Sequence, residues 1–297
     1  VASLGDWVPK AGGSVRGAIA VSGAYPKLDA SGKLGGSAIV SGDAHLQAFT
    51  LDFDAKDLSA PSGRLALDAK TLSAAGYTFD TVRLDANGTQ AAHQLKLDVH
   101  GKPLSLALAL DGALTQNQNA SDWRGTLKTL TLDQQGLPEW KLAQPTPLSY
   151  VGGVFNLSEL CLRAGAPGIC AQATQDAKSG TNAKFRLEHL PLAMLARLGS
   201  PDATMKLDGE LNGNGTIVIV PSGALSGNVS ITSDQGTIVY PDSASKALLS
   251  YKGFRVDAAL APAQNTVTIA GDLNDGGRID GHIVTGAADA SGAMPLS

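Results

Sequence analysis

Residues 104–110 read Leu-Ser-Leu-Ala-Leu-Ala-Leu, and this stretch decides the fold class. Large and small side chains alternate through it without a break, which is a period of two and not the 3.6 of a helix. Successive side chains of a β-strand point to opposite faces of a sheet. The stretch therefore predicts a strand with one leucine face and one face of small residues.

The same alternation recurs along the chain, for example at residues 49–53, 82–84, 95–99, 229–231 and 267–269. These runs return every ~10–15 residues and are separated by Gly, Asn, Asp, Ser and Pro, a pattern typical of short strands joined by turns. No run is both long and purely apolar, which argues against a buried parallel sheet covered by helices. The predicted fold class is all-β.

Dipeptides that favour positive φ suggest where the turns lie. We expect hairpin turns at Asn87-Gly88, Asp111-Gly112, Asp208-Gly209, Asn212-Gly213, Asn214-Gly215 and Asp275-Gly276.

The composition excludes several classes of protein. The 297 residues include 35 Gly and 14 Pro, without the period of three that collagen requires. A hydrophobic content of 43% excludes a disordered chain. The net charge of −4 leaves no broad basic surface, so we expect no nucleic-acid partner.

The expected sheet is too large to fold into one compact globular domain. About 18 strands at ~4.8 Å spacing make a sheet nearly 90 Å across, and open sheets of that size curl, split or stack. Aromatic residues are only 5% of the chain, so the apolar face is mostly aliphatic. We predict an elongated sheet, folded along its length, with an aliphatic inner face that forms a groove.

One segment breaks the alternation. Leu190, Leu192, Met194, Leu195 and Leu198 share one helical face, and residues 190–198 are predicted to form a short amphipathic helix. The helix either plugs one end of the β core or acts as a lid over a cavity.

Cys161 and Cys170 are the only cysteines, and the Gly-Ala-Pro-Gly between them can turn the chain back on itself. We expect a disulfide, which would indicate an oxidising compartment. Two buried thiols and a metal site are the alternatives, although zinc would need two further ligands.

No motif carries catalytic chemistry. The five histidines are scattered singly, and no Gly-x-Ser-x-Gly occurs. Asp52, Asp54 and Asp57 begin like a calcium loop, but Lys56 occupies the glycine position. We expect no enzyme activity, no catalytic residue, no metal and no cofactor.

No stretch approaches the ~20 consecutive apolar residues of a membrane helix. The chain starts at Val1 without a signal-peptide pattern, so we expect a piece of a longer protein.

The chain resembles the TamB family of translocation and assembly module subunits, within the wider AsmA-like and bridge-like lipid transfer proteins. The resemblance rests on Trp-Arg-Gly-Thr-Leu at 123–127, Trp-Lys-Leu at 140–142, the two cysteines, and the segments 185–195 and 225–230. Their order is similar to the middle-to-late region of the family. Residues 121–297 carry the more specific part and residues 1–120 resemble degenerate strand repeats, all within one elongated segment, 1–297.

The resemblance implies a lengthwise-folded sheet, called a β-taco, which carries phospholipid through the periplasm between the inner and outer membranes. It also implies an outer-membrane β-barrel partner of the TamA type, reached through a missing C-terminal region, and an inner-membrane anchor in a missing N-terminal region.

We expect acyl chains to lie along the aliphatic face, with no dominant site. The residues expected to line the groove are Phe49, Leu51, Phe53, Leu65, Leu67, Val82, Leu84, Leu95, Leu97, Val99, Leu104, Leu106, Leu108, Leu110, Leu130, Leu132, Ile217, Ile219, Val229, Ile231, Val267 and Ile269. An alternative is an assembly factor for outer-membrane proteins or autotransporters, which adds a client strand to an open sheet edge. A surface adhesin or carbohydrate-acting β-helix would need stacked aromatic or carboxylate ladders, which the sequence does not contain.

Overall fold

The computed structural model describes residues 2–3, 11–74, 76–102, 104–117, 120–194, 206–239 and 247–286. These residues form 19 strands and one helical stretch at 192–194, so the all-β prediction is confirmed. The chain divides into two compact units, Val1–Gly152 and Gly153–Ser297, which are described separately. The prediction that residues 1–297 form one elongated segment stays a prediction.

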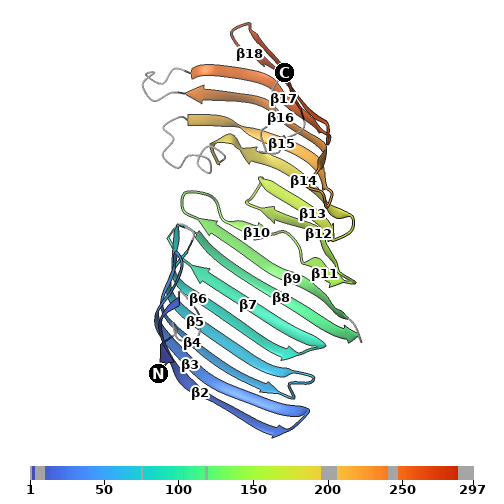
Figure 1. The fold of residues 1–297 in the computed structure, drawn as a ribbon. Coiled ribbons are helices and arrows are strands. Elements are labelled where there is room, and N and C mark those ends of the chain that lie inside the picture. Colours follow the sequence, from blue (N-terminus) through green and yellow to red (C-terminus); the bar gives the residue numbers. More distant parts are fainter. Residues whose placement is uncertain are drawn as a thin grey trace. The chain divides into compact units, whose positions relative to one another are not determined.

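The first unit is an antiparallel meander in which each strand from β2 to β9 pairs with the next (Figure 1). The short strand β1 pairs with β2, while β10 and β11 pair with successive parts of β9. The strands are β1 (Ala2–Ser3), β2 (Ala11–Ala24), β3 (Lys27–Ser41), β4 (Ala44–Lys56), β5 (Ser62–Ala74), β6 (Tyr77–Thr89), β7 (Ala92–His100), β8 (Leu104–Asn117), β9 (Ala120–Gln134), β10 (Trp140–Leu142) and β11 (Thr146–Val151).

The second unit repeats this plan with its own meander, in which β12 to β19 pair in chain order. Its strands are β12 (Val154–Arg163), β13 (Gly168–Asp176), β14 (Gly180–Pro191), β15 (Lys206–Ile219), β16 (Leu225–Val239), β17 (Ala247–Leu260), β18 (Gln264–Leu273) and β19 (Arg278–Gly286).

Many strands are longer than the alternating runs suggest, and this corrects most of the predicted turns. Only Asp275-Gly276 lies in a turn, between β18 and β19, whereas Asn87-Gly88 lies in β6 and the other four dipeptides lie in β8 or β15. Gly88 pairs with His93, and a Cβ on it would lie 2.3 Å from the carbonyl oxygen of Ala92. Position 88 therefore requires glycine because two backbones approach closely there, and not because the chain turns.

The predicted helix at 190–198 also needs correction. Leu190 and Pro191 belong to β14, because they pair with Leu211 and Glu210 of β15. Residues 192–194 are helical, and residues 195–198 lie outside the described residues.

A line of interrupted pairing crosses β2 to β6 in the first unit. The register skips Gly13, Ala38, Gln47, Thr71 and Asp80, which are neighbours on successive strands. Three of these residues have left-handed φ values, 105° at Gly13, 52° at Ala38 and 49° at Thr71. Interruptions of this kind bend strands, and the ends of these strands turn out of the plane of the rest of the unit (Figure 1).

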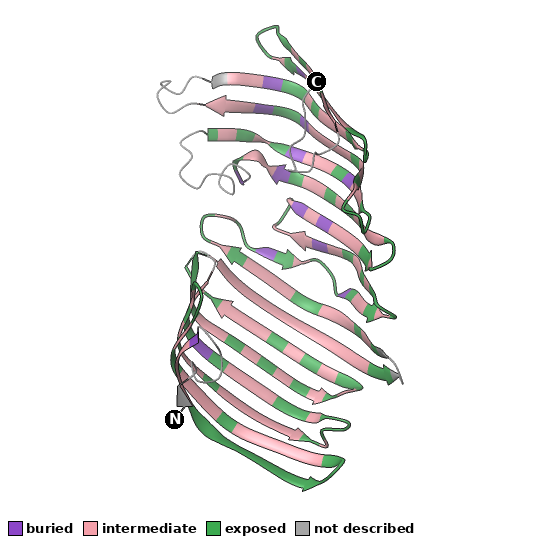
Figure 2. Ribbon diagram, viewed as in Figure 1, coloured by how far each residue is buried: buried purple, intermediate pink, exposed green. Residues whose placement is uncertain are grey.

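A similar line crosses β14 to β17 in the second unit, where the register breaks beside His189, Leu211, Asp234 and Gly253. Several of the buried side chains of this unit lie along it, including Leu190, Leu211, Ser233 and Tyr251. Most of the remaining strand residues in both units are half-buried, which Figure 2 shows as long pink stretches.

Candidate functional site

The strand register of the first unit aligns aliphatic side chains into rows that cross the sheet. Residues that pair across adjacent strands have side chains on the same face. The central row runs from β3 to β9 and consists of Leu34, Leu51, Leu67, Leu84, Leu97, Leu108 and Leu130. We call the face that carries it the apolar face of the first unit.

A second row lies on each side of the central row. Towards the bend the row is Gly36, Phe49, Ala69, Val82, Val99, Leu106 and Leu132. On the other side it is Gly32, Phe53, Leu65, Ala86, Leu95, Leu110 and Leu127. Leu104 follows the same face of β8, two residues before Leu106. The structure therefore brings every expected groove residue of this unit onto one face.

The second unit has an apolar face of its own. One row consists of Ala171, Phe185, Gly215, Val229, Ala258, Val267 and Ile283, and the next of Ile169, Leu187, Gly213, Ile231, Val256, Ile269 and Gly281. Ile217 and Ile219 lie on the same face of β15 as Gly215. The expected residues of this unit thus also share one face.

Several residues of these rows were not expected from the sequence. Leu34, Leu127, Phe185, Leu187 and Val256 extend the apolar faces, yet none was expected to line the groove. Leu34 is followed by two glycines, so no run of alternating apolar and polar residues extends through it. Val256 lies between the charged residues Arg255 and Asp257, and the alternation around it is also short. The signal that would have found them is the pairing register, which places them opposite residues with clearer alternation.

Both apolar faces are only partly covered by protein. All the expected groove residues are half-buried except Ile219, which is 41% exposed. The buried hydrophobic residues of the described chain are few: Ala11, Ala69, Trp140, Cys161, Cys170, Leu190, Met194, Leu211 and Tyr251. Extended apolar surface left in contact with water indicates a binding surface.

The opposite face of the first unit is charged. Asp52 lies 3.1 Å from the Lys33 ammonium and 3.2 Å from the Arg64 guanidinium, and Arg83 lies 3.1 Å from Asp68. These residues belong to rows that alternate with the aliphatic ones, such as Lys33, Asp52, Ala66, Asp85, Lys96 and Ala109. The sheet therefore has one face suited to water and one suited to hydrocarbon.

The first hairpins of this unit are held by a carboxylate near one end of the strands. The backbone N–H of Asp57 donates to Asp29 Oδ1 at 3.0 Å, and the Lys56 ammonium lies 3.4 Å from the same carboxylate. The backbone hydrogen bond is the main cause that lowers the pKa of Asp29, and Lys56 adds to it. Asp29 therefore stays charged while it joins the β2–β3 and β4–β5 hairpins.

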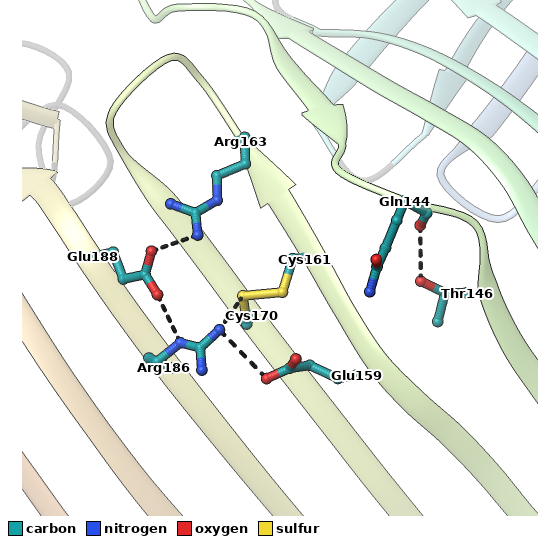
Figure 3. The surroundings of a disulfide bond; sticks show 8 residues. All are labelled: Gln144, Thr146, Glu159, Cys161, Arg163, Cys170, Arg186 and Glu188. Atoms are coloured by element: carbon teal, nitrogen blue, oxygen red, sulfur yellow. Dashed lines mark hydrogen bonds and ion pairs between the residues drawn. A yellow bond between two sulfur atoms is a disulfide. The ribbon is translucent and has the colours of Figure 1, made fainter.

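Cys161 and Cys170 form the expected disulfide, as directly paired residues of β12 and β13 (Figure 3). The disulfide lies on the polar face of the second unit, since its neighbours in sequence, Leu160, Leu162 and Ile169, point the other way. It closes a loop of eight residues between the cysteines. The disulfide therefore crosslinks the two strands of a hairpin and does not interrupt the apolar face.

An ion-pair network lies beside the disulfide (Figure 3). Glu188 accepts from Arg163 at 2.5 Å and from Arg186 at 2.7 Å, and Arg186 also reaches Glu159 at 3.5 Å and the Cys170 sulfur at 3.5 Å. The hydrogen bond from Arg163 is the main cause that lowers the pKa of Glu188, and the charge of Arg186 adds to it.

The described residues offer little for metal or acid–base chemistry. Glu159, Cys161 and Cys170 lie close enough together to hold an ion, but both sulfurs are consumed by the disulfide. His189 Nδ1 lies 2.8 Å from Glu210 Oε2 beside a polar cavity of about 540 Å³, but both side chains are more than half exposed. Such a pair is typical of a surface ion pair.

No helix among the described residues is both long and apolar enough to cross a bilayer.

A family defined as "TamB, N-terminal domain" matches residues 1–295. The chain belongs to the TamB family. No solved structure matches it. The family is associated with the cell envelope and with outer-membrane machinery. The resemblance noted from the sequence is thus confirmed, but the match to the N-terminal domain corrects its placement in the middle-to-late region of the family.

Proposed function

We propose that this chain is a non-enzymatic lipid conduit, which carries phospholipid through the periplasm by holding acyl chains against its apolar faces. The observation that carries the proposal is the set of in-register aliphatic rows that are only partly buried. Membership of an envelope-associated family supports the setting.

The dimensions of the apolar face suit acyl chains. The central leucine row crosses the strands from β3 to β9, and six steps of ~4.8 Å give a length of about 29 Å. The hydrocarbon core of a bilayer is ~30 Å thick, so the chains of one leaflet occupy about 15 Å. An acyl chain can therefore lie wholly on the face, where each buried CH₂ contributes ~0.8 kcal/mol.

The similarity of the side chains along each row supports transfer of lipid and argues against tight binding of lipid at one place. A lipid that moves across the strands meets leucine after leucine in the central row. Conduction requires that binding be similar from place to place, because one tight site would trap the lipid. The charged residues lie on the opposite face and leave the path free of fixed charge.

The direct test is photolabelling of the 297-residue chain by a phosphatidylethanolamine that carries a diazirine on one acyl chain. After irradiation, mass spectrometry of the peptides should find label on β5 to β8, at residues of the aliphatic rows such as Leu97 and Leu108. Label only at polar-face residues such as Asp98 and Ala107, or no more label than on an unrelated soluble β-protein, would contradict the proposal.

The partners implied by the family are part of the proposal. An outer-membrane β-barrel of the TamA type would receive lipid at one end, and the inner membrane would supply it at the other. Disulfide formation between Cys161 and Cys170 supports an oxidising compartment such as the periplasm.

A second candidate, assembly of outer-membrane proteins by strand addition, is favoured by a different observation. Among the described residues, β19 pairs only with β18, and residues 16–24 of β2 pair only with β3. An open edge of this kind can add a client strand. Ile19 and Val21 on β2 are 58% and 62% exposed.

Paired substitutions separate the two candidates. Ala18→Lys together with Ala20→Lys places charge on the edge strand, which opposes strand addition. These residues pair with Lys33 and Ser31, so the added charge stays off the apolar face. Leu108→Arg places charge in the middle of the apolar face, far from that edge. A conduit loses lipid labelling mainly with Leu108→Arg, whereas a strand-adding factor loses crosslinking to a nascent outer-membrane protein mainly with the edge pair.

A further inference from the structure

Aromatic rings on the apolar face of the first unit lie over glycines. Phe49 of β4 pairs with Gly36 of β3, and Phe53 pairs with Gly32. A Cβ added to Gly36 would lie 2.2 Å from Cε1 of the Phe49 ring, and one added to Gly32 would lie 2.7 Å from Cε1 of the Phe53 ring. Each ring thus fills the space that a side chain on the neighbouring strand would need.

The second unit repeats the arrangement with other residues. Phe185 pairs with Gly215, where an added Cβ would lie 2.5 Å from the ring. Tyr251 pairs with Gly236, where it would lie 2.3 Å from the hydroxyl oxygen. The same arrangement in both units shows that it does not depend on one local packing accident.

Trp123 covers two glycines at once. An added Cβ would lie 2.3 Å from the indole ring at Gly125 and 2.8 Å from it at Gly112. The indole Nε1 donates to His93 Nε2 at 3.0 Å, which holds the ring in this position.

Backbone conformation does not explain these glycines. Gly32, Gly36, Gly215 and Gly236 have no left-handed φ, unlike Gly13 and Gly88 in the same sheets. Any residue could adopt their extended conformation. At Gly36 the three nearest atoms to an added Cβ all belong to the Phe49 ring. What glycine provides at Gly36 is therefore room for the ring.

Side chains of a strand normally stand nearly perpendicular to the sheet. An upright phenylalanine would rise above the neighbouring leucines and valines, whereas a ring that lies over a glycine stays low. The glycines therefore allow aromatic residues on the apolar face without raising its surface.

We propose that Gly36, Gly32 and Gly215 are positioning residues that keep Phe49, Phe53 and Phe185 flat, so that unbranched acyl chains can lie across the strands without obstruction. This inference rests on the proposed lipid-conduit function and specifies its substrate as extended hydrocarbon chains. The glycines act through the rings and do not themselves need to touch lipid.

Gly36→Ala tests the proposal, because the added methyl pushes the Phe49 ring upward. Gly35→Ala is the matched control, since its added Cβ would lie 3.5 Å from the nearest atom, the Phe49 carbonyl oxygen. With the diazirine phosphatidylethanolamine, we expect labelling of β4 to β6 to fall about fivefold or more in Gly36→Ala, the size expected when one methyl overfills a packed site. Gly35→Ala should label like the unchanged chain.

Rescue separates a positioning role from simple destabilisation. In Gly36→Ala/Phe49→Leu the smaller side chain leaves room for the methyl, and labelling should return to within about twofold of the unchanged chain. Equal labelling of Gly36→Ala and Gly35→Ala, or a loss that Phe49→Leu does not restore, would overturn the proposal. Gly215→Ala with Phe185→Leu extends the test to the second unit in case Gly36→Ala fails to fold. The rescue there should be partial, because an added Cβ at Gly215 would also lie 2.9 Å from the carbonyl oxygen of Asn228.

The outcome also separates this inference from the proposed function. If the unchanged chain takes up no label, the conduit and the positioning role both fail. If the unchanged chain is labelled and Gly36→Ala is labelled equally, only the positioning role fails.

Discussion

The hydroxyl groups of Tyr251 and Ser233 lie 2.8 Å apart and form a buried hydrogen bond at the bend of the second unit. Ser233 is 1% exposed and Tyr251 is 7% exposed. The Ser233 hydroxyl also lies 3.5 Å from the carbonyl oxygen of Gln235, and loss of a hydrogen bond between buried hydroxyls is costly.

Tyr251→Phe should lower the free energy of unfolding by about 1–2 kcal/mol, because it leaves the Ser233 hydroxyl without this partner. Amide hydrogen exchange of β15 to β17 in increasing denaturant measures the change, since all three tryptophans of the chain lie in the first unit. Tyr150→Phe, at a side chain that is 50% exposed, is the control and should have little effect. A loss for Tyr251→Phe/Ser233→Ala equal to the sum of the two single losses would contradict coupling between the hydroxyls.

Leu108→Arg should reduce acyl-chain labelling about tenfold or more, since an unpaired charge against hydrocarbon costs several kcal/mol. Ala107→Arg is the matched control, because Ala107 pairs with Asp98 on the polar face of the same strand. Photolabelling and thermal unfolding are measured on both variants. The conduit proposal is contradicted if the two variants, both folded, label to the same extent.

Cys161→Ser/Cys170→Ser should lower the free energy of unfolding of the second unit by about 2–3 kcal/mol, as expected for a disulfide that closes a short loop. Because the disulfide lies on the polar face, lipid labelling of the folded variant should not change. Unfolding with and without reductant provides the check. Reductant should destabilise the unchanged chain to a similar degree and leave the variant as it was; an effect on the variant would point to another cause.

Glu188 should stabilise the fold only when it is ionised. Its pKa lies below the ordinary value of 4.5, so its contribution is fully present above pH 4.5 and is lost as the pH falls through the lowered value. Glu188→Gln should therefore lower the melting temperature at pH 7, and the difference from the unchanged chain should shrink at pH 3. A difference that stays constant between pH 7 and pH 3 would show that the ion pairs with Arg163 and Arg186 contribute nothing through charge.

Alternation in the sequence was enough to predict the all-β fold and to choose, in each unit, residues that share one face of the sheet. Leu106 and Leu108 illustrate this, because a strand allows only two orientations and the small residues between them mark the other one. The disulfide could also be predicted, because the Gly-Ala-Pro-Gly between Cys161 and Cys170 can turn the chain back on itself.

Other features depend on contacts between strands that alternation does not encode. Asn87-Gly88 resembles a hairpin turn, but its glycine serves a close backbone approach within β6. Thr71 adopts a left-handed conformation, although threonine favours an ordinary strand. The pairing of the strands is interrupted at Thr71, as it is at Ala38 two strands away. The spacing of Leu190 and the leucines after it predicts a helix, yet pairing with Leu211 keeps Leu190 in β14.

Because the rows continue in register across the strands, each hairpin adds a fixed length to the apolar face. Insertion or removal of two neighbouring strands, such as β6 and β7, would change the apolar face by about 10 Å and leave the strand direction and the orientation of every other side chain unchanged. The length of the apolar face can therefore be changed by duplicating or deleting hairpins, without redesign of the surface that the hairpins form.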